Sequence, residues 1–92
     1  MISRLKMTRL ILYTGTNCPR CPEAKKIVED VTQALRLKKG EDWDIKNIDD
    51  EENMLTALQY QIASTPSIVI DGEVFIMGAV PDRKELVDKL KD

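Results

Sequence analysis

Two cysteines, Cys18 and Cys21, are the residues of this 92-residue chain best suited to chemistry, and two residues separate them. The pair stands where a short apolar run gives way to a segment with helical spacing. On the first turn of such a helix, positions i and i+3 bring the two sulfurs within bonding distance. The unpaired N–H groups and the positive dipole end of the helix stabilise a thiolate there. Such settings lower a cysteine pKa from about 8.5 to roughly 3.5–7.5, so a C-x-x-C pair at this junction predicts redox chemistry.

The two residues between the cysteines are expected to tune that chemistry. Pro19 suits a first-turn position, because the N–H that proline lacks has no partner there. Arg20 places a permanent cation between the cysteines. Either this charge stabilises the Cys18 thiolate and raises the reduction potential, or solvent screening leaves it with little effect.

Metal binding and a structural disulfide are the competing uses of the pair. Zinc takes four ligands, and the chain has two cysteines and no histidine, so only a dimer that shares four thiolates would hold it. An iron–sulfur cluster bridged between two chains has the same requirement. A disulfide around a loop of about four residues removes little chain entropy and would be a weak staple. Dithiol–disulfide exchange is therefore favoured, with no metal or cofactor of the chain's own.

The composition narrows the choice of partners and compartment. Fourteen Lys and Arg stand against sixteen Asp and Glu, for a net charge of −2, so no basic surplus favours nucleic acid. Apolar runs of about four residues are far short of the roughly 20 that span a bilayer, and no membrane partner is expected. The chain starts without the apolar stretch of a signal peptide, which indicates a cytoplasmic protein. We expect one domain over residues 1–92, in which residues 1–7 are disordered or lie upstream of the true start. Met7 is an alternative start.

The strands that must position the cysteine pair are visible as short apolar runs. They are predicted at residues 10–13, 43–48, 67–70 and 74–77. Asp71-Gly72 between the last two is a two-residue hairpin signal. A β-α-β crossover makes the first two strands parallel. The sequence therefore predicts an α/β fold, β-α-β-α-β-β-α, in which one mixed four-stranded sheet of order 2-1-3-4 is flanked by three helices.

Three helices complete this arrangement. Apolar spacing predicts the first over residues 22–37, closed by two lysines and then Gly40. The second begins in the acidic run at residues 49–52, ends before Ser64, and has as its apolar residues Met54, Leu55, Leu58 and Ile62. Asp82 and Glu85 form a capping pair for the third.

Three residues outside the pair have two interpretations each. Pro66, between Thr65 and the third strand, fits a cis turn or an ordinary strand start. Asp49 fits helix-start electrostatics, although it could also lie near the dithiol. Met77 fits a docking surface or the core.

Taken together, three segments resemble the thioredoxin superfamily, and in particular its small, glutaredoxin-sized thioredoxins of archaea and some bacteria. The segments are residues 18–22 (CPRCP), residues 60–62 leading to 65–67 (YQI and TPS), and residues 75–81 (FIMGAVP). The likeness runs over nearly the whole chain from Thr8 onward. It implies the thioredoxin fold for the predicted arrangement of strands and helices.

The resemblance also implies roles for single residues. Cys18 would attack a target disulfide, and Cys21 would resolve the mixed disulfide. Pro66 would be cis and close to the sulfurs, with the backbone of Thr65 pairing to the substrate peptide. Gly78 would give a flat patch where the partner docks. The protein would then be a monomeric reductase of protein disulfides, regenerated by a separate dithiol reductase.

Departures from the family keep alternatives open. Ordinary thioredoxins have the sequence W-C-G-P-C at the cysteine pair, where this chain has N-C-P-R-C. They also hold a buried acid six positions before the first cysteine, and this chain has Leu12 there. The proton acceptor for Cys21 is therefore unidentified. Glutaredoxins share C-P-x-C, but they add a Gly-Gly pair and an acid after the last strand. This chain keeps only Gly78 and a displaced Asp82. A glutathione-dependent reductase and a dimer bridged by a metal or an iron–sulfur cluster are therefore the alternatives.

Overall fold

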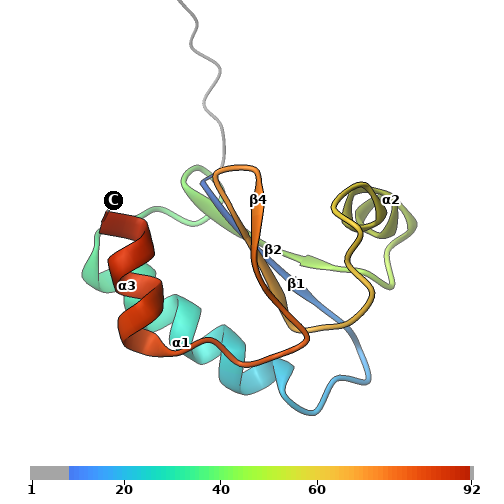
Figure 1. Cartoon of the computed structure of the whole chain (residues 1–92), viewed down its shortest axis with the longest axis horizontal. Coiled ribbons are helices and arrows are strands. Elements are labelled where there is room, and N and C mark those ends of the chain that lie inside the picture. The colour runs from blue at the N-terminus through green and yellow to red at the C-terminus, as the bar shows by residue number, and fades with distance from the viewer. Residues whose placement is uncertain (1–8, 92) are drawn as a thin grey trace, which may run out of the picture.

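The computed structural model describes residues 9–91, so the expectation for residues 1–7 lies outside the described part of the chain (Figure 1). Within that part the elements follow the predicted order β-α-β-α-β-β-α. They are β1 (Leu10–Thr14), α1 (Cys21–Ala34), β2 (Trp43–Asn47), α2 (Glu51–Gln59), β3 (Ser67–Ile70), β4 (Glu73–Met77) and α3 (Arg83–Lys91). None of the helices described here is long and apolar enough to cross a membrane.

The four strands form one mixed sheet with the predicted order β2-β1-β3-β4. β1 and β2 are parallel, and their register pairs Leu10 with Trp43 and Thr14 with Asn47. β3 is antiparallel to both β1 and β4. Because β1 and β2 are parallel, their carboxyl ends lie at the same edge of the sheet, and the loop that carries the cysteines leaves from this edge.

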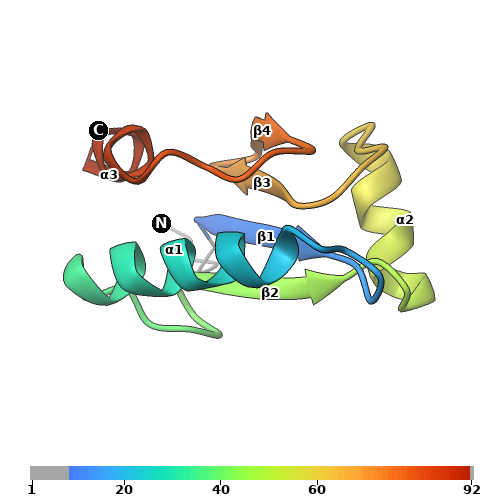
Figure 2. The ribbon, with the colours of Figure 1, turned by 90° about the horizontal axis from the view of Figure 1, so that it is seen from below.

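Helices cover both faces of the sheet, with α1 and α3 on one face and α2 on the other (Figure 1, Figure 2). Successive side chains of a strand point to opposite faces. Leu10 and Leu12 of β1 accordingly join the core cluster of α1 and α3, whereas Tyr13 joins a smaller cluster with Ala57 of α2. All four residues of β3 are buried, because this inner strand is covered on both faces.

The first helix ends three residues earlier than the sequence predicted. α1 stops at Ala34, and Arg36 takes a left-handed backbone conformation with φ of 61°. The amide of Leu37 then donates to the carbonyl of Thr32 at 2.8 Å, which closes the helix end. Gly40, expected as the stop, has φ of 89° and lies in the turn before β2. The prediction failed because arginine took the left-handed position that glycine usually fills.

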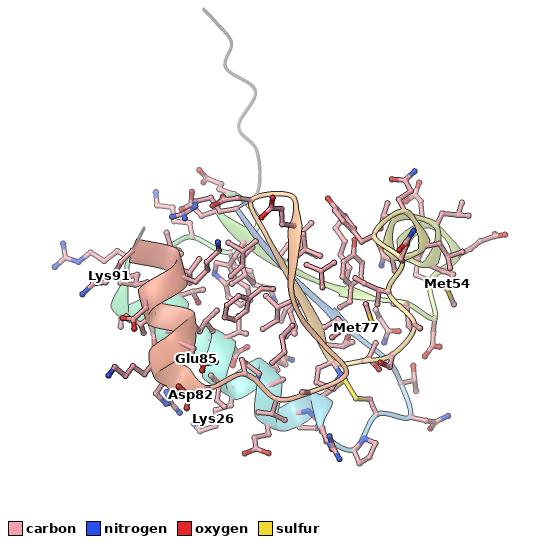
Figure 3. All side chains as sticks on the ribbon, in the orientation of Figure 1. Lys26, Met54, Met77, Asp82, Glu85 and Lys91 are labelled. Carbon is pink, nitrogen blue, oxygen red and sulfur yellow. A yellow bond between two sulfur atoms is a disulfide. The ribbon has the colours of Figure 1, made fainter. Side chains whose placement is uncertain are left out.

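The second helix is shorter than predicted and buries less of its apolar face. It ends at Gln59, and Ile62 is buried beyond the helix. Leu55 and Leu58 are each 57% exposed, and Met54, labelled with Met77 in Figure 3, is 38% exposed. Within α2 the small Ala57 is the buried residue, so the packing side of this helix is not its large apolar side.

The hairpin turn after β3 and the cap of α3 were both predicted correctly from local sequence. Asp71 and Gly72 have φ of 52° and 82°, the left-handed values that a two-residue hairpin turn of type I′ requires. β4 begins at Glu73, one residue before the predicted start. Asp82 precedes α3, and its carboxylate accepts a 3.0 Å hydrogen bond from the amide of Glu85, which confirms the predicted cap.

Candidate active site

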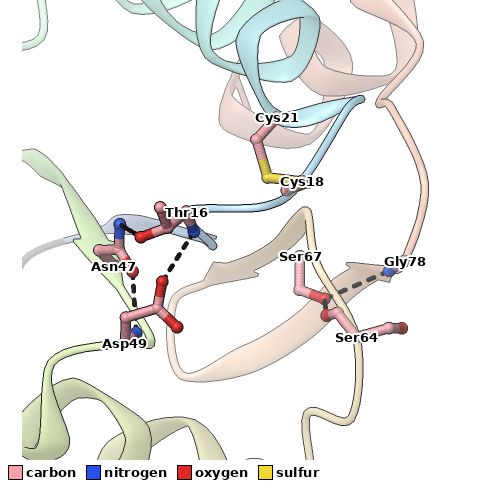
Figure 4. The surroundings of a disulfide bond; sticks show 8 residues. All are labelled: Thr16, Cys18, Cys21, Asn47, Asp49, Ser64, Ser67 and Gly78. Carbon is pink, nitrogen blue, oxygen red and sulfur yellow. Dashed lines mark hydrogen bonds between the residues drawn. A yellow bond between two sulfur atoms is a disulfide. The ribbon is translucent and has the colours of Figure 1, made fainter.

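Cys18 and Cys21 form a disulfide at the start of α1, with 5.4 Å between their Cα atoms (Figure 4). α1 begins at Cys21, and Cys18 lies in the preceding turn, where its carbonyl accepts a 3.4 Å hydrogen bond from the Cys21 amide. The expectation that both cysteines share the first helical turn is therefore wrong. Pro22, rather than Pro19, is the proline of the first turn, where a backbone N–H is dispensable.

The two cysteines differ in exposure. Cys21 is only 5% exposed, whereas Cys18 is partly buried. Pro19 and Arg20 between them are exposed, and Arg20 is the N-cap residue of α1 without a side-chain hydrogen bond to the helix. Cys18 is therefore the cysteine of the pair that is more accessible to a large partner.

The peptide bond between Thr65 and Pro66 is cis, as the resemblance implied. Gly15 shows how close this loop lies to the cysteine loop. A Cβ atom on Gly15 would lie 3.3 Å from the Thr65 hydroxyl oxygen and 3.9 Å from the Cys18 Cβ. Thr65 and Cys18 thus flank the same glycine, and a side chain there would crowd the Thr65 hydroxyl while making an ordinary contact with Cys18.

Gly78 is bonded to the loop that contains the cis proline (Figure 4). Its amide donates to the carbonyl of Pro66 at 2.8 Å and lies 3.2 Å from the Ser67 hydroxyl oxygen. Its φ is 72°, and a Cβ atom there would lie 2.5 Å from the hydroxyl oxygen of Ser64. The backbone conformation therefore favours glycine, and any side chain would also displace the Ser64 hydroxyl.

The backbone of Thr65 has no hydrogen bond to any other residue in the part of the chain that the structure describes. Among residues 9–91, neither its amide nor its carbonyl has a hydrogen-bond partner, although the neighbouring Pro66 carbonyl accepts from both Gly78 and Ala79. The loop is thus fixed at Pro66, while the peptide groups of the preceding residue stay available to another chain.

The loop before Cys18 is held by one residue at the end of β2 and one just after it (Figure 4). The Thr16 amide donates to the Asp49 carboxylate at 2.8 Å, and the Asn47 side-chain amide lies 3.4 Å from the Thr16 hydroxyl oxygen. The Asp49 amide in turn donates to the Asn47 side-chain oxygen at 2.8 Å. Hydrogen bonds from the side chain and the backbone of Thr16 lower the pKa of Asp49 below its usual value.

Sequence reasoning placed Asp49 near the dithiol as one of two options, and missed Thr16 and Asn47. The signal was available in the predicted parallel pairing of the first two strands. Residues that follow the ends of neighbouring parallel strands lie side by side, so short polar side chains at 16, 47 and 49 were candidates for contact.

A cavity of about 280 Å³ lies against the disulfide. Its lining consists of Thr14, Gly15, Thr16, Cys18, Cys21, Pro22, Lys25 and Ile45. Leu12, at the position where ordinary thioredoxins hold an acid, is fully buried in the apolar core. The buried polar residues of the described chain are Thr32 and Ser67, so no carboxylate is buried within residues 9–91.

The comparisons with known proteins agree with this geometry. The family model described as "Thioredoxin domain" matches residues 8–91. A thioredoxin of Methanocaldococcus jannaschii is 33% identical over 87 residues, which cover 95% of this chain and 96% of the relative. A probable thioredoxin of Archaeoglobus fulgidus is 32% identical over 93 residues, which cover 92% and 91% of the two chains.

Solved structures support the fold. The solution structure of an uncharacterised thioredoxin-like protein from Clostridium perfringens has a TM-score of 0.71 at 18% identity and covers 97% of this chain and 72% of its own. The X-ray structure of Fasciola hepatica thioredoxin has a TM-score of 0.63 at 16% identity and covers 94% and 82%. With the matched family and the disulfide at the start of α1, the chain belongs to the thioredoxin family and is a thiol–disulfide oxidoreductase.

Proposed function

We propose that this protein reduces the disulfides of other proteins, with Cys18 as the attacking cysteine and Cys21 as the resolving one. The observation that carries this proposal is the unequal exposure of the two cysteines within one disulfide. In the reduced protein, the Cys18 thiolate attacks a substrate disulfide and forms a mixed disulfide, and one substrate sulfur leaves as a thiolate. Cys21 then attacks Cys18, expels the second substrate thiol and restores the disulfide, so two electrons pass to the substrate.

Thr65, Pro66 and Gly78 form the proposed substrate-binding surface. The unpaired backbone of Thr65 next to Cys18 is suited to hydrogen bonding with an extended peptide, as in strand addition. Gly78 lacks a side chain beside this loop, and Met77, 42% exposed, adds an apolar contact at the end of β4. This surface favours a polypeptide over a small thiol as the substrate.

Pro19 and Arg20 are the proposed tuning residues. Arg20 is exposed at the N-terminus of α1, adjacent in sequence to Cys21, where a cation and the helix dipole both favour a thiolate. Pro19 restricts the turn that links the two cysteines, because its ring fixes φ.

The proposed partners are protein disulfides on one side and a separate dithiol reductase on the other, with the protein acting as a monomer in the reducing cytoplasm. Thioredoxins act on protein disulfides and are themselves reduced by a reductase, and the archaeal relatives carry that name. Glutathione would need a free acidic grip after the last strand. Ala79 follows Gly78 where glutaredoxins have a second glycine, and the displaced Asp82 caps α3, which supports the protein substrate instead.

Single-turnover reduction of a protein disulfide tests the proposal. Cys18→Ser should abolish reduction, and Cys21→Ser should stop at the mixed disulfide. If Cys21→Ser instead keeps full turnover on a glutathione mixed disulfide, the glutaredoxin-type alternative holds. Stoichiometric metal or iron–sulfur cluster in a dimer purified without oxygen would favour the bridged alternative.

The reduction potential of the Cys18–Cys21 couple provides an independent measurement. A value near the roughly −270 mV of thioredoxin agrees with a reductant, whereas one near the about −120 mV of a strong oxidant contradicts the proposed direction of electron flow.

A further inference from the structure

The cavity beside the disulfide is lined by one charged side chain among the described residues. Of the residues within 9–91 that line it, Lys25 alone carries a charge, and both cysteines line the same cavity. We propose that Lys25 stabilises the Cys21 thiolate across this cavity and so enables the resolving step. This inference rests on the proposed function, because it concerns the same exchange reaction.

The resolving step requires a charge where burial opposes it. Cys21 is 5% exposed, next to Ala24 of the same helix, which is fully buried. Burial in apolar surroundings raises the pKa of a thiol, since the thiolate loses its solvation. Cys21 must nevertheless ionise in the mixed disulfide, because the thiolate is the attacking species.

The described chain has no buried histidine or carboxylate that could accept the Cys21 proton. The chain has no histidine, and no carboxylate is buried within residues 9–91. Leu12 and Ile45 of the two parallel strands present only hydrocarbon on this side. An ionised Cys21 therefore depends on solvent for its proton and on a nearby cation for its stability.

Helix geometry directs Lys25 toward Cys21. The two residues are separated by four positions on α1, so they lie on one face, one turn apart. Side chains of a helix lean toward its N-terminus, so we expect Lys25 to extend over the turn that contains Cys21, and both residues line the same cavity. Within residues 9–91, no acidic side chain forms an ion pair with Lys25, so its charge is not already neutralised by a partner.

The other charged groups around Cys21 do not replace this lysine. Arg20 is exposed at the N-cap and does not line the cavity. The Asp49 carboxylate accepts from the Thr16 amide, and Asp49 does not line the cavity. β1 and β3 contain no charged residue. Asp44 and Lys46 of β2 alternate with the cavity-lining Ile45 and so lie on the opposite face of the sheet. The pair of Arg83 in α3 and Asp30 in α1 lies nine residues beyond Cys21, about two and a half turns along α1.

Lys25 is chemically unchanged by the resolving step. The Cys21 thiol releases its proton to solvent, and the thiolate attacks the Cys18 sulfur of the mixed disulfide. The bond between Cys18 and the substrate sulfur breaks as the Cys18–Cys21 bond forms, and the departing substrate thiolate takes up a proton. The positive charge of Lys25 stabilises the mixed disulfide only in the form in which Cys21 is a thiolate.

Three variants test this assignment: Lys25→Gln, Lys25→Arg and Lys26→Gln. Lys26 is the matched control, since it is an exposed lysine on the same helix that does not line the cavity. The first readout is the pH profile of Cys21 alkylation in a Cys18→Ser background, where Cys21 is the sole thiol. Lys25→Gln should move its midpoint upward by about half a pH unit, while Lys25→Arg and Lys26→Gln leave it in place.

The second readout is the lifetime of the mixed disulfide in single-turnover reduction. Lys25→Gln should prolong it about two- to fivefold at neutral pH without slowing the initial attack by Cys18. Equal effects of Lys25→Gln and Lys26→Gln, or no effect of either on the Cys21 profile, would overturn the assignment. Failure of Cys21→Ser to accumulate a mixed disulfide through Cys18 would instead reject the proposed function itself.

Discussion

The two faces of the sheet are held by different interactions. On the face covered by α1 and α3, ten buried residues form one apolar cluster. On the face covered by α2, the buried cluster is limited to Tyr13, Ala57, Ile62 and Val69. Apolar burial contributes about 25 cal/mol per Å², so the first face supplies most of the stability. The second face must depend more on polar contacts.

Those polar contacts form a continuous path. The Tyr13 hydroxyl lies 2.9 Å from the Thr56 hydroxyl oxygen, and the Thr56 hydroxyl donates to the carbonyl of Asn53. The Asn53 side chain donates to the carbonyl of Asn47, whose own side chain reaches Thr16 in the cysteine loop. The apolar face thus provides a fixed base for α1, and the polar face positions the loop in front of it.

The largest expected effect on stability comes from truncating Leu12, and Leu58 is the residue to compare it with. Leu12→Ala removes a fully buried side chain from the apolar cluster and should lower the free energy of unfolding by about 2–5 kcal/mol. Leu58→Ala, at a position 57% exposed on α2, should change it by no more than about 0.5 kcal/mol. Urea unfolding measures both. Similar losses in the two variants would show that the faces are not built differently.

The same contrast explains what the sequence predicted and what it did not. The strands, their order and the cysteine pair follow from local patterns: β-prone runs, the Asp71-Gly72 turn and the C-x-x-C spacing. The exposure of α2 does not, because Leu55 and Leu58 carry the same apolar signal as buried leucines. The side of α2 that packs carries Thr56 and Ala57, which meet Tyr13 from a strand more than forty positions away.

The end of α1 and the positioning of the cysteine loop were missed for a related reason. Arg36 has no propensity that marks a helix stop, and its left-handed conformation comes with the bond between Leu37 and Thr32. The contacts of Thr16 with Asn47 and Asp49 join segments that are about thirty residues apart. Patterns within a short window do not report such contacts.

A smaller loss of stability is expected when the path of polar contacts is broken at Tyr13. Tyr13→Phe removes the hydroxyl that contacts Thr56 and should lower the free energy of unfolding by about 0.5–1.5 kcal/mol. Tyr60→Phe is the control, because the Tyr60 hydroxyl has no hydrogen-bond partner within residues 9–91. Hydrogen exchange should show the loss concentrated in α2. A uniform loss across α1 and α2 would argue against a separately held face.

The smallest change in stability, and the one closest to the sulfurs, is expected from the titration of Asp49. Hydrogen bonds from the side chain and amide of Thr16 lower the pKa of this carboxyl, so the ionised form holds the loop. A depressed pKa means that the contact is complete at neutral pH and is lost only as the pH falls through a midpoint below the ordinary 3.8. The chemical shift of the Thr16 amide proton should report that midpoint.

Asp49→Asn should abolish the titration, whereas Asp50→Asn, at a carboxylate bonded to the Glu52 amide, should preserve it. A midpoint above 3.8, or a titration that survives Asp49→Asn, would mean that another group sets the position of the cysteine loop.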